Sequence, residues 1–293
     1  MRSHLCPDGC KQRATLTRSV YRNTNGIDFT SVRRFATGAR THGLCIIEQV
    51  VFVATAGWSV PREHAGLIQR DGTGLQRYSS VLGAAEINST FYRRHLPKTF
   101  ERWRNSVPTC FRFAVKLPRS ITHEAALASP ANLLAHFFDD VRGLGDKLGP
   151  ILVQLPASLD FERRRARAFF RALRALHSGP VACEPRHAGW YGPAASAMLV
   201  DYDVARVVAD PARPLAAREP GGSHSLRYTR WHGSPRVYWS SYGEDALRAL
   251  ADDTLRAPPQ SEIWCVFDNT ASGSAFHDAH RFRAMLRADS SQG

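Results

Sequence analysis

The sequence has no apolar run near the length of about 20 residues that a membrane-spanning helix needs. Its first residues, MRSHLCPDGCKQR, also lack the apolar centre of a secretory signal. The cysteines have neither the dense spacing of a disulfide scaffold nor the paired C-x-x-C spacing of a zinc site. These absences predict a cytoplasmic protein with reduced thiols and no membrane partner. The six cysteines are Cys6, Cys10, Cys45, Cys110, Cys183 and Cys265.

Metal-binding patterns are equally scarce. His4 lies close to Cys6 and Cys10, but no second pair of ligands accompanies them. We therefore predict no metal and no cofactor, and we interpret these residues as part of a tail.

Acidic residues are few beside basic ones, 26 against 39, so the formal net charge is +13. Residues 1–49 hold eight basic and three acidic residues, a net of +5. Such a field attracts anions, which include phosphates, nucleic acid and anionic lipid. We interpret residues 1–49 as a basic extension, disordered or derived from a misassigned start, and residues 289–293 as a C-terminal tail.

Eight short apolar runs recur from residue 51 onward, and amphipathic or loop-like segments separate them. Residues 129–145 and 161–176 have helical spacing of apolar residues, and Ser129 is placed to cap the first of these helices. Eight alternating units in about 240 residues predict an α/β fold, a single (β/α)8 TIM-type barrel over residues 50–288. A dinucleotide-binding open sheet fits less well, because no G-x-G-x-x-G is present. The runs are 51–58, 84–92, 111–118, 151–156, 181–190, 205–210, 226–233 and 263–270.

Polar residues within or just after these runs should line one pocket, because ligands of such barrels bind where the strands end. Glu86, Lys116 and Glu184 interrupt apolar strands, where a charge is costly unless it is paired. We name these three as catalytic candidates; the alternative is a structural ion-pair network. The candidates for binding substrate are Asn88, Tyr92, His123, Gln154, Arg186, His187, Trp190, Arg230, His232 and Asn269.

The segments AGWS, EINSTFYR, FRFAVKLPRSITH, LGPILVQLPASLDF, EPRHAGWY, RYTRWHG and VFDNTASGSA carry a resemblance. In content and order they resemble the signature blocks of the YecE-like family, a TIM-barrel family of unknown biochemical function. The resemblance implies the barrel fold and covers most of the candidates above. Two positions depart from the family: Pro185 replaces an aromatic residue, and Asp268 with Asn269 replaces a pair of asparagines.

The candidate set is suited to acid and base chemistry on a small anionic substrate, phosphorylated or sugar-like. Lys116, Arg186 and Arg230 can hold a phosphate or carboxylate, and the glutamates can exchange protons. A Schiff base at Lys116 is disfavoured here, because we expect a neighbouring Glu to keep its ammonium charged. Two alternatives stay open: a nucleic-acid-binding or processing protein of the endonuclease-like barrel type, and a non-catalytic ligand-binding barrel.

Overall fold

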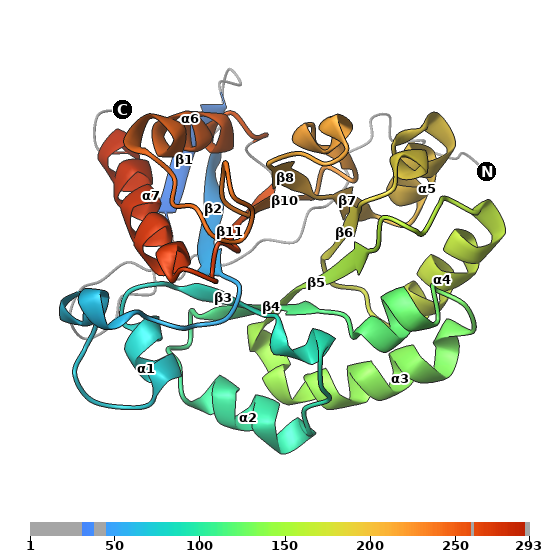
Figure 1. The fold of residues 1–293 in the computed structure, drawn as a ribbon, viewed down its shortest axis with the longest axis horizontal. Coiled ribbons are helices and arrows are strands. Elements are labelled where there is room, and N and C mark those ends of the chain that lie inside the picture. The colour runs from blue at the N-terminus through green and yellow to red at the C-terminus, as the bar shows by residue number, and fades with distance from the viewer. Residues whose placement is uncertain (1–30, 38–44, 259–260, 291–293) are drawn as a thin grey trace, which may run out of the picture.

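The computed structural model describes residues 31–37, 45–258 and 261–290, which form two sheets with helices around the outside of the strands (Figure 1). The first sheet has the order β1 (Ser31–Thr37), β2 (Cys45–Thr55), β11 (Glu262–Phe267), β10 (Leu226–Trp231) and β8 (Val208–Asp210). The second has the order β3 (Ala84–Ile87), β4 (Arg112–Lys116), β5 (Leu148–Leu155), β6 (Val181–Pro185), β7 (Val204–Arg206) and β9 (Gly221–Gly222). Only the outermost pairs, β1 with β2 and β7 with β9, are antiparallel among the described strands.

The helices begin with recognisable sequence signals. Proline occupies the first turn of α2, α3 and α5, where its missing N–H costs no hydrogen bond. Thr73 and Gln76 form a capping box at α1. The helices are α1 (Gly74–Ser79), α2 (Pro97–Asn105), α3 (Pro130–Val141), α4 (Arg163–Leu176), α5 (Pro193–Asp201), α6 (Glu244–Leu255) and α7 (Ser274–Ser290), and none in the described ranges is long and apolar enough to cross a bilayer.

Each of the eight predicted runs contains a strand, and the α/β class is confirmed. The run at 205–210 is divided: β7 pairs with β6, the Val207 N–H donates to the Cys183 carbonyl of β6, and β8 pairs with β10. At the other edge, one parallel bridge joins Ala56 to Glu86. The hydrogen-bonded ladders therefore form two sheets that nearly meet, where the sequence predicted one closed barrel.

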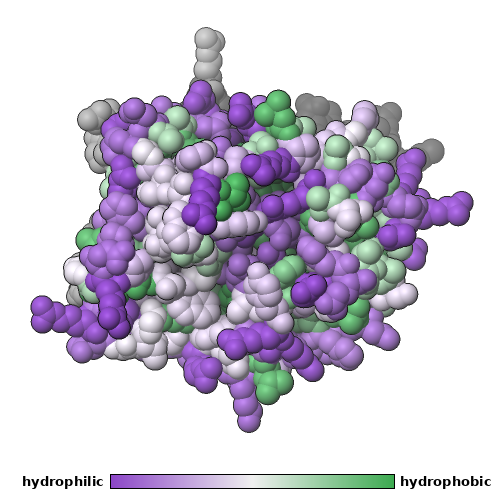
Figure 2. Space-filling view, in the orientation of Figure 1, coloured by the Kyte–Doolittle hydropathy of each residue, from purple (hydrophilic) through white to green (hydrophobic). Residues whose placement is uncertain are grey.

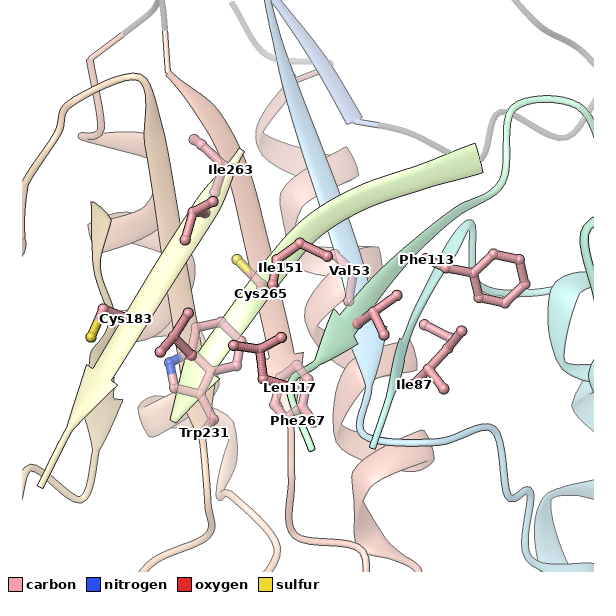
Figure 3. Close-up of a cluster of buried hydrophobic side chains, with 14 of the residues drawn as sticks. Val53, Ile87, Phe113, Leu117, Ile151, Cys183, Trp231, Ile263, Cys265 and Phe267 are labelled. Atoms are coloured by element: carbon pink, nitrogen blue, oxygen red, sulfur yellow. The ribbon is translucent and has the colours of Figure 1, made fainter. Parts of the chain in front are cut away.

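The two faces of the strands carry separate hydrophobic clusters, because successive side chains of a strand point to opposite faces. The larger cluster packs against the helices, and Figure 3 shows members that include Val53, Ile87, Ile151 and Cys265. The smaller lies on the opposite face, which we call the inner face, and draws on strands of both sheets. Its buried members are Phe52, Ala54, Ala84, Ala114, Leu152, Ala182, Ala205, Val207, Leu226, Tyr228, Trp264 and Val266.

Two local expectations need comment. Ser129 does precede α3, but it adopts a left-handed conformation (φ 43°) and makes no capping hydrogen bond, so the predicted cap is wrong. Within the predicted extension, residues 31–37 and 45–49 form strand, whereas residues 1–30 and 38–44, including His4, Cys6 and Cys10, lie outside the described residues. The role of residues 1–49 stays a prediction.

Candidate functional site

A band of polar side chains lies on the inner face. It is closer to the carboxyl ends of the parallel strands than the inner apolar cluster is. Each lies two residues beyond an apolar member of that cluster, so the period-two alternation points it to the same face. All are at most 8 % exposed. The band comprises Glu86 on β3, Lys116 on β4, Gln154 on β5, Glu184 on β6, Arg230 on β10 and Asp268 after β11.

Arg230 is the centre of this band. Its fully buried guanidinium donates to both oxygens of Glu86 (3.1 and 2.8 Å), to Glu184 Oε2 (2.8 Å) and to Asp268 Oδ2 (3.0 Å). Tyr228 adds a hydrogen bond from its hydroxyl to Glu86 Oε2 (2.8 Å). A planar fork of donors suits this bridging role, and the bonds tie β10 of the first sheet to β3 and β6 of the second. Arg230 and Glu86 therefore link the two sheets in the most buried part of the site.

His232 lies between two carboxylates. Its Nδ1 is 3.0 Å from Asp268 Oδ2 and its Nε2 is 3.1 Å from Glu184 Oε1. Ionised carboxylates only accept hydrogen bonds, so both ring nitrogens must carry protons and the ring is an imidazolium. Burial alone would lower the pKa of His232, but the hydrogen bonds to Asp268 and Glu184 raise it.

Glu184 accepts four hydrogen bonds, two at each oxygen. Oε2 accepts from Arg230 and from Gln154 Nε2 (3.0 Å), and Oε1 accepts from His232 and from Arg186 Nη2 (3.0 Å). Burial would raise the pKa of Glu184, but the Arg230 charge and the His232 hydrogen bond hold it well below its ordinary value. With every lone pair occupied, Glu184 is a fixed anion that orients its neighbours.

Asp268 is less completely bonded. Oδ2 accepts from Arg230 and His232, whereas Oδ1 accepts no hydrogen bond from the described residues. Burial would raise the pKa of Asp268, but Arg230 and then His232 lower it. Its free oxygen is consequently an ionised acceptor beside the network.

Lys116 is the cation of the site that has no counter-ion. Its side chain is buried, yet its ammonium makes neither a hydrogen bond nor an ion pair within 4.0 Å to any described residue. Instead Nζ lies 4.2 Å from the ring centroid of Phe91. Burial, and next the charge of Arg230, lower the pKa of Lys116 to about 8, although Glu86, Glu184 and Asp268 partly oppose this.

Two further candidates, Arg186 and His123, lie beside Glu184 and Phe91 respectively. The Arg186 side chain is 28 % exposed and donates through Nη2 to Glu184 and to the Tyr238 hydroxyl (3.1 Å). His123 packs edge-on against Phe91, with 4.9 Å between ring centroids. Burial lowers the pKa of His123, and the charges of Lys116, Arg119 and Arg186 lower it further. Positive groups thus converge beside the buried network.

Other predicted residues lie elsewhere. Trp190 is 1 % exposed in the hydrophobic core, with its indole N–H on the Leu159 carbonyl (3.0 Å). Asn269 is fully buried and donates to Ser240 and Asp278, where it holds a loop against α7. The only polar side-chain atom of Trp190 is thus already bonded, whereas the buried Oδ1 of Asn269 has no hydrogen-bond partner among the described residues.

His187, Tyr92 and Asn88 have mixed positions. His187 Nδ1 accepts from the Gly189 N–H as the cap of a short helix (Ala188–Tyr191), while Tyr92 is 71 % exposed. Asn88 directly follows β3, and its buried Oδ1 has no hydrogen-bond partner among the described residues. Asn88 therefore remains a candidate for contact with a ligand.

The sequence reasoning missed two residues of the site, Tyr228 and Tyr238. Tyr228 alternates with Arg230 and His232 along one strand, so the period-two pattern could have found it. Asp268 lies in the run at 263–270, whose polar residues were expected to line the pocket, and it departs from the asparagine of the family. Tyr238 lies in the loop after β10, and no motif marks it.

The described residues contain no group of three or more His, Cys, Asp or Glu side chains arranged to hold a metal ion. Arg230 lies between the three carboxylates and donates a hydrogen bond to each of them.

Comparison with known proteins assigns the chain to a family. Residues 52–292 match the family described as "Protein of unknown function DUF72", so the chain belongs to the DUF72 family, which includes YecE-like proteins. UPF0759 protein YecE of Escherichia coli K12 is 27% identical over 177 residues, 58% of this chain and 62% of that protein. UPF0759 protein YunF of Bacillus subtilis 168 is 22% identical over 49% of this chain and 53% of that protein. The chain thus aligns with less than two thirds of the length of these curated relatives.

Solved structures of the family share the fold. A DUF72 family protein from Thermotoga maritima MSB8 has a TM-score of 0.66 and 25% identity, over 81% of this chain and 99% of that one. Another from Enterococcus faecalis V583 has a TM-score of 0.69 and 21% identity, over 81% and 95% of the two chains. These likenesses establish the fold and leave the reaction to be argued from the site.

Proposed function

We propose that the protein is an enzyme that acts on a small anionic molecule, phosphorylated or sugar-like, at the polar end of the inner face. The observation that carries this proposal is the unmatched charge of Lys116. Glu86, Glu184 and Asp268 are matched by Arg230, Arg186 and the imidazolium of His232, so Lys116 adds a positive charge with no partner. An anion would supply that partner.

The roles differ from those expected at first. Glu184 accepts two hydrogen bonds at each oxygen and Glu86 accepts three in all, so both position other groups, and Arg230 is too deeply buried to contact a ligand. Arg186 is the partly exposed cation that would bind the anionic group. Lys116 and the free Oδ1 of Asp268 would exchange protons, since both ionisable atoms lack committed partners among the described residues.

We also propose that the two sheets complete a (β/α)8 barrel of the TIM type. Three features support this: the bridge from Ala56 to Glu86, the position of Val207 between β6 and β10, and an inner cluster drawn from both sheets. A barrel would place the polar band at its carboxyl-terminal mouth, the usual place for a ligand.

The test is a thermal-shift screen of the full chain with phosphorylated sugars, inorganic phosphate and short duplex DNA, at low and high salt. A ligand at 100 times its Kd should stabilise the folded state by about 2.7 kcal/mol. We expect a phosphorylated sugar to raise Tm, Arg186→Ala to abolish the rise, and Arg248→Ala, at a side chain 61% exposed on α6, to preserve it.

Turnover of the stabilising ligand is then followed by phosphorus NMR. Binding without turnover would overturn the enzymatic role and leave a ligand-binding protein. A rise in Tm with DNA alone that fades with salt would instead favour the nucleic-acid-binding function, because phosphate contacts weaken as salt increases.

A further inference from the structure

Two buried lysines of this chain differ in how their ammonium groups are used. Lys147 Nζ donates to the carbonyls of Arg104 and Val107, both at 2.7 Å. The Lys116 ammonium makes no such bond to any described residue, although Lys116 is 5 % exposed and Lys147 is 7 % exposed. Lys147 therefore has a structural role, whereas Lys116 keeps an amine that is free to react.

The carboxylates of the site form no ion pair with Lys116. Glu86, Glu184 and Asp268 face Arg230 and His232, and none lies within 4.0 Å of the Lys116 ammonium. The expectation that a neighbouring Glu would keep the ammonium protonated therefore has no direct ion pair behind it, although Glu86 and Glu184 do raise its pKa. Around Lys116 the inner face presents Arg230 from β10, Glu86 from β3, Glu184 from β6 and Asp268 after β11, and their combined effect with burial brings its pKa to about 8.

The use of lysine here is selective. The chain contains 35 arginines and four lysines, at positions 11, 98, 116 and 147. Arginine supplies a permanent positive charge, but only lysine can lose its proton near neutral pH and act as a nucleophile. A lysine at the site is therefore suited to chemistry that arginine cannot perform.

We infer that Lys116 is the nucleophile of the site and forms a Schiff base with the carbonyl group of an aldehyde or ketone substrate. The inference deepens the proposed function, on which it rests for the anionic group that Arg186 would bind. The substrate class is then a small carbonyl compound that carries a phosphate or carboxylate, such as a phosphorylated keto sugar.

The step balances without an oxidant or reductant. The lone pair of neutral Nζ forms a bond to the carbonyl carbon, and the carbonyl oxygen gains the proton that Nζ loses, which gives a carbinolamine. A second proton, from solvent, reaches that hydroxyl, the C–O bond breaks, and water leaves. The product is a protonated imine, with one hydrogen still on nitrogen and a double bond to carbon.

The test uses trapping by reduction. The full chain is incubated at pH 7.5 with formaldehyde, the smallest carbonyl probe, or with dihydroxyacetone phosphate, and the imine is reduced with cyanoborohydride. Peptide mass mapping then measures modification of each lysine. Because the Lys116 amine makes no hydrogen bond to any described residue and burial lowers its pKa to about 8, we expect Lys116 to react faster than exposed Lys98.

The controls separate this inference from the proposed function. Lys116→Arg should abolish the adduct with dihydroxyacetone phosphate, and Lys98→Arg should preserve it. If Lys116 reacts no faster than Lys98 with either probe, the inference is wrong, even where the phosphorylated probe raises Tm through Arg186. If formaldehyde labels Lys116 selectively while no anion raises Tm, the nucleophile stands and the anionic substrate fails.

Discussion

The two ends of the inner face are made by the same strands with the same alternation, yet they are stabilised in opposite ways. At one end Leu152 and Trp264 are fully buried among apolar neighbours. The other end lies two residues further along each strand. There Arg230 is fully buried among three carboxylates. Packed apolar groups stabilise without regard to pH, whereas buried charges require every partner to be present. This difference supports the second end as the candidate site, and Figure 2 shows that hydrophilic residues cover much of the face of the molecule in view.

The largest effect should come from Arg230→Met. Removal of the guanidinium leaves Glu86, Glu184 and Asp268 without their shared cation, and breaking a buried pair in this way costs about 3–5 kcal/mol. We expect the free energy of unfolding, measured by urea denaturation at pH 7, to fall by that amount. The loss should shrink toward pH 4.5, because protonated carboxyl groups no longer repel one another.

Leu152→Ala is the matched change at the apolar end. It should cost about 2–5 kcal/mol through lost burial and a cavity, with the same loss at pH 4.5 and pH 7. Equal pH responses of the two variants would remove the distinction between the two ends.

The sequence predicted the residues of this comparison better than their roles. The eight runs contain the strands, because β-branched and aromatic residues between polar segments are a strong local signal. Period-two alternation also brought Glu86, Lys116 and Glu184 to one face. The sequence could not predict which carboxylate Arg230 would bind, because Glu86 lies 144 positions away in the chain.

Loops and caps were the least predictable parts. Tyr238 contacts Arg186 from a loop that has no motif, and Trp190 looked like a residue at a strand end but packs in the core. The division at Val207, which separates the ladders of β6 and β10, depends on the packing of both sheets. Local sequence carries no signal for such long-range geometry.

A smaller effect with a distinctive pH dependence is expected for His232→Gln. The folded-state pKa of His232 is raised, so its contribution to stability is fully present below the unfolded pKa of about 6.5 and is lost as pH rises through the folded value. The variant should therefore lose more stability at pH 6 than at pH 9, with urea denaturation at both as the measurement. His136→Gln, at an exposed position of α3, should show no such change. A loss that grew with pH would mean that His232 is neutral between its carboxylates.

The smallest effect should come from Asp268→Asn, which restores the asparagine expected from the family resemblance. The new amide oxygen can accept from Arg230 and His232 as Oδ2 does, while its NH2 takes the place of Oδ1, to which no described residue donates. Only the charge is lost, so we expect about 1 kcal/mol of destabilisation, the difference between charged and neutral hydrogen bonds. The pKa of His232, followed by proton NMR, should fall because one of its two carboxylates is gone.

Glu184→Gln offers the contrast: both Glu184 oxygens accept two donors, so an NH2 at either must face N–H groups and should cost more. Equal losses in the two variants would contradict the assignment of a free Oδ1 to Asp268. Loss of turnover in a well-folded Asp268→Asn would connect that free oxygen to proton exchange.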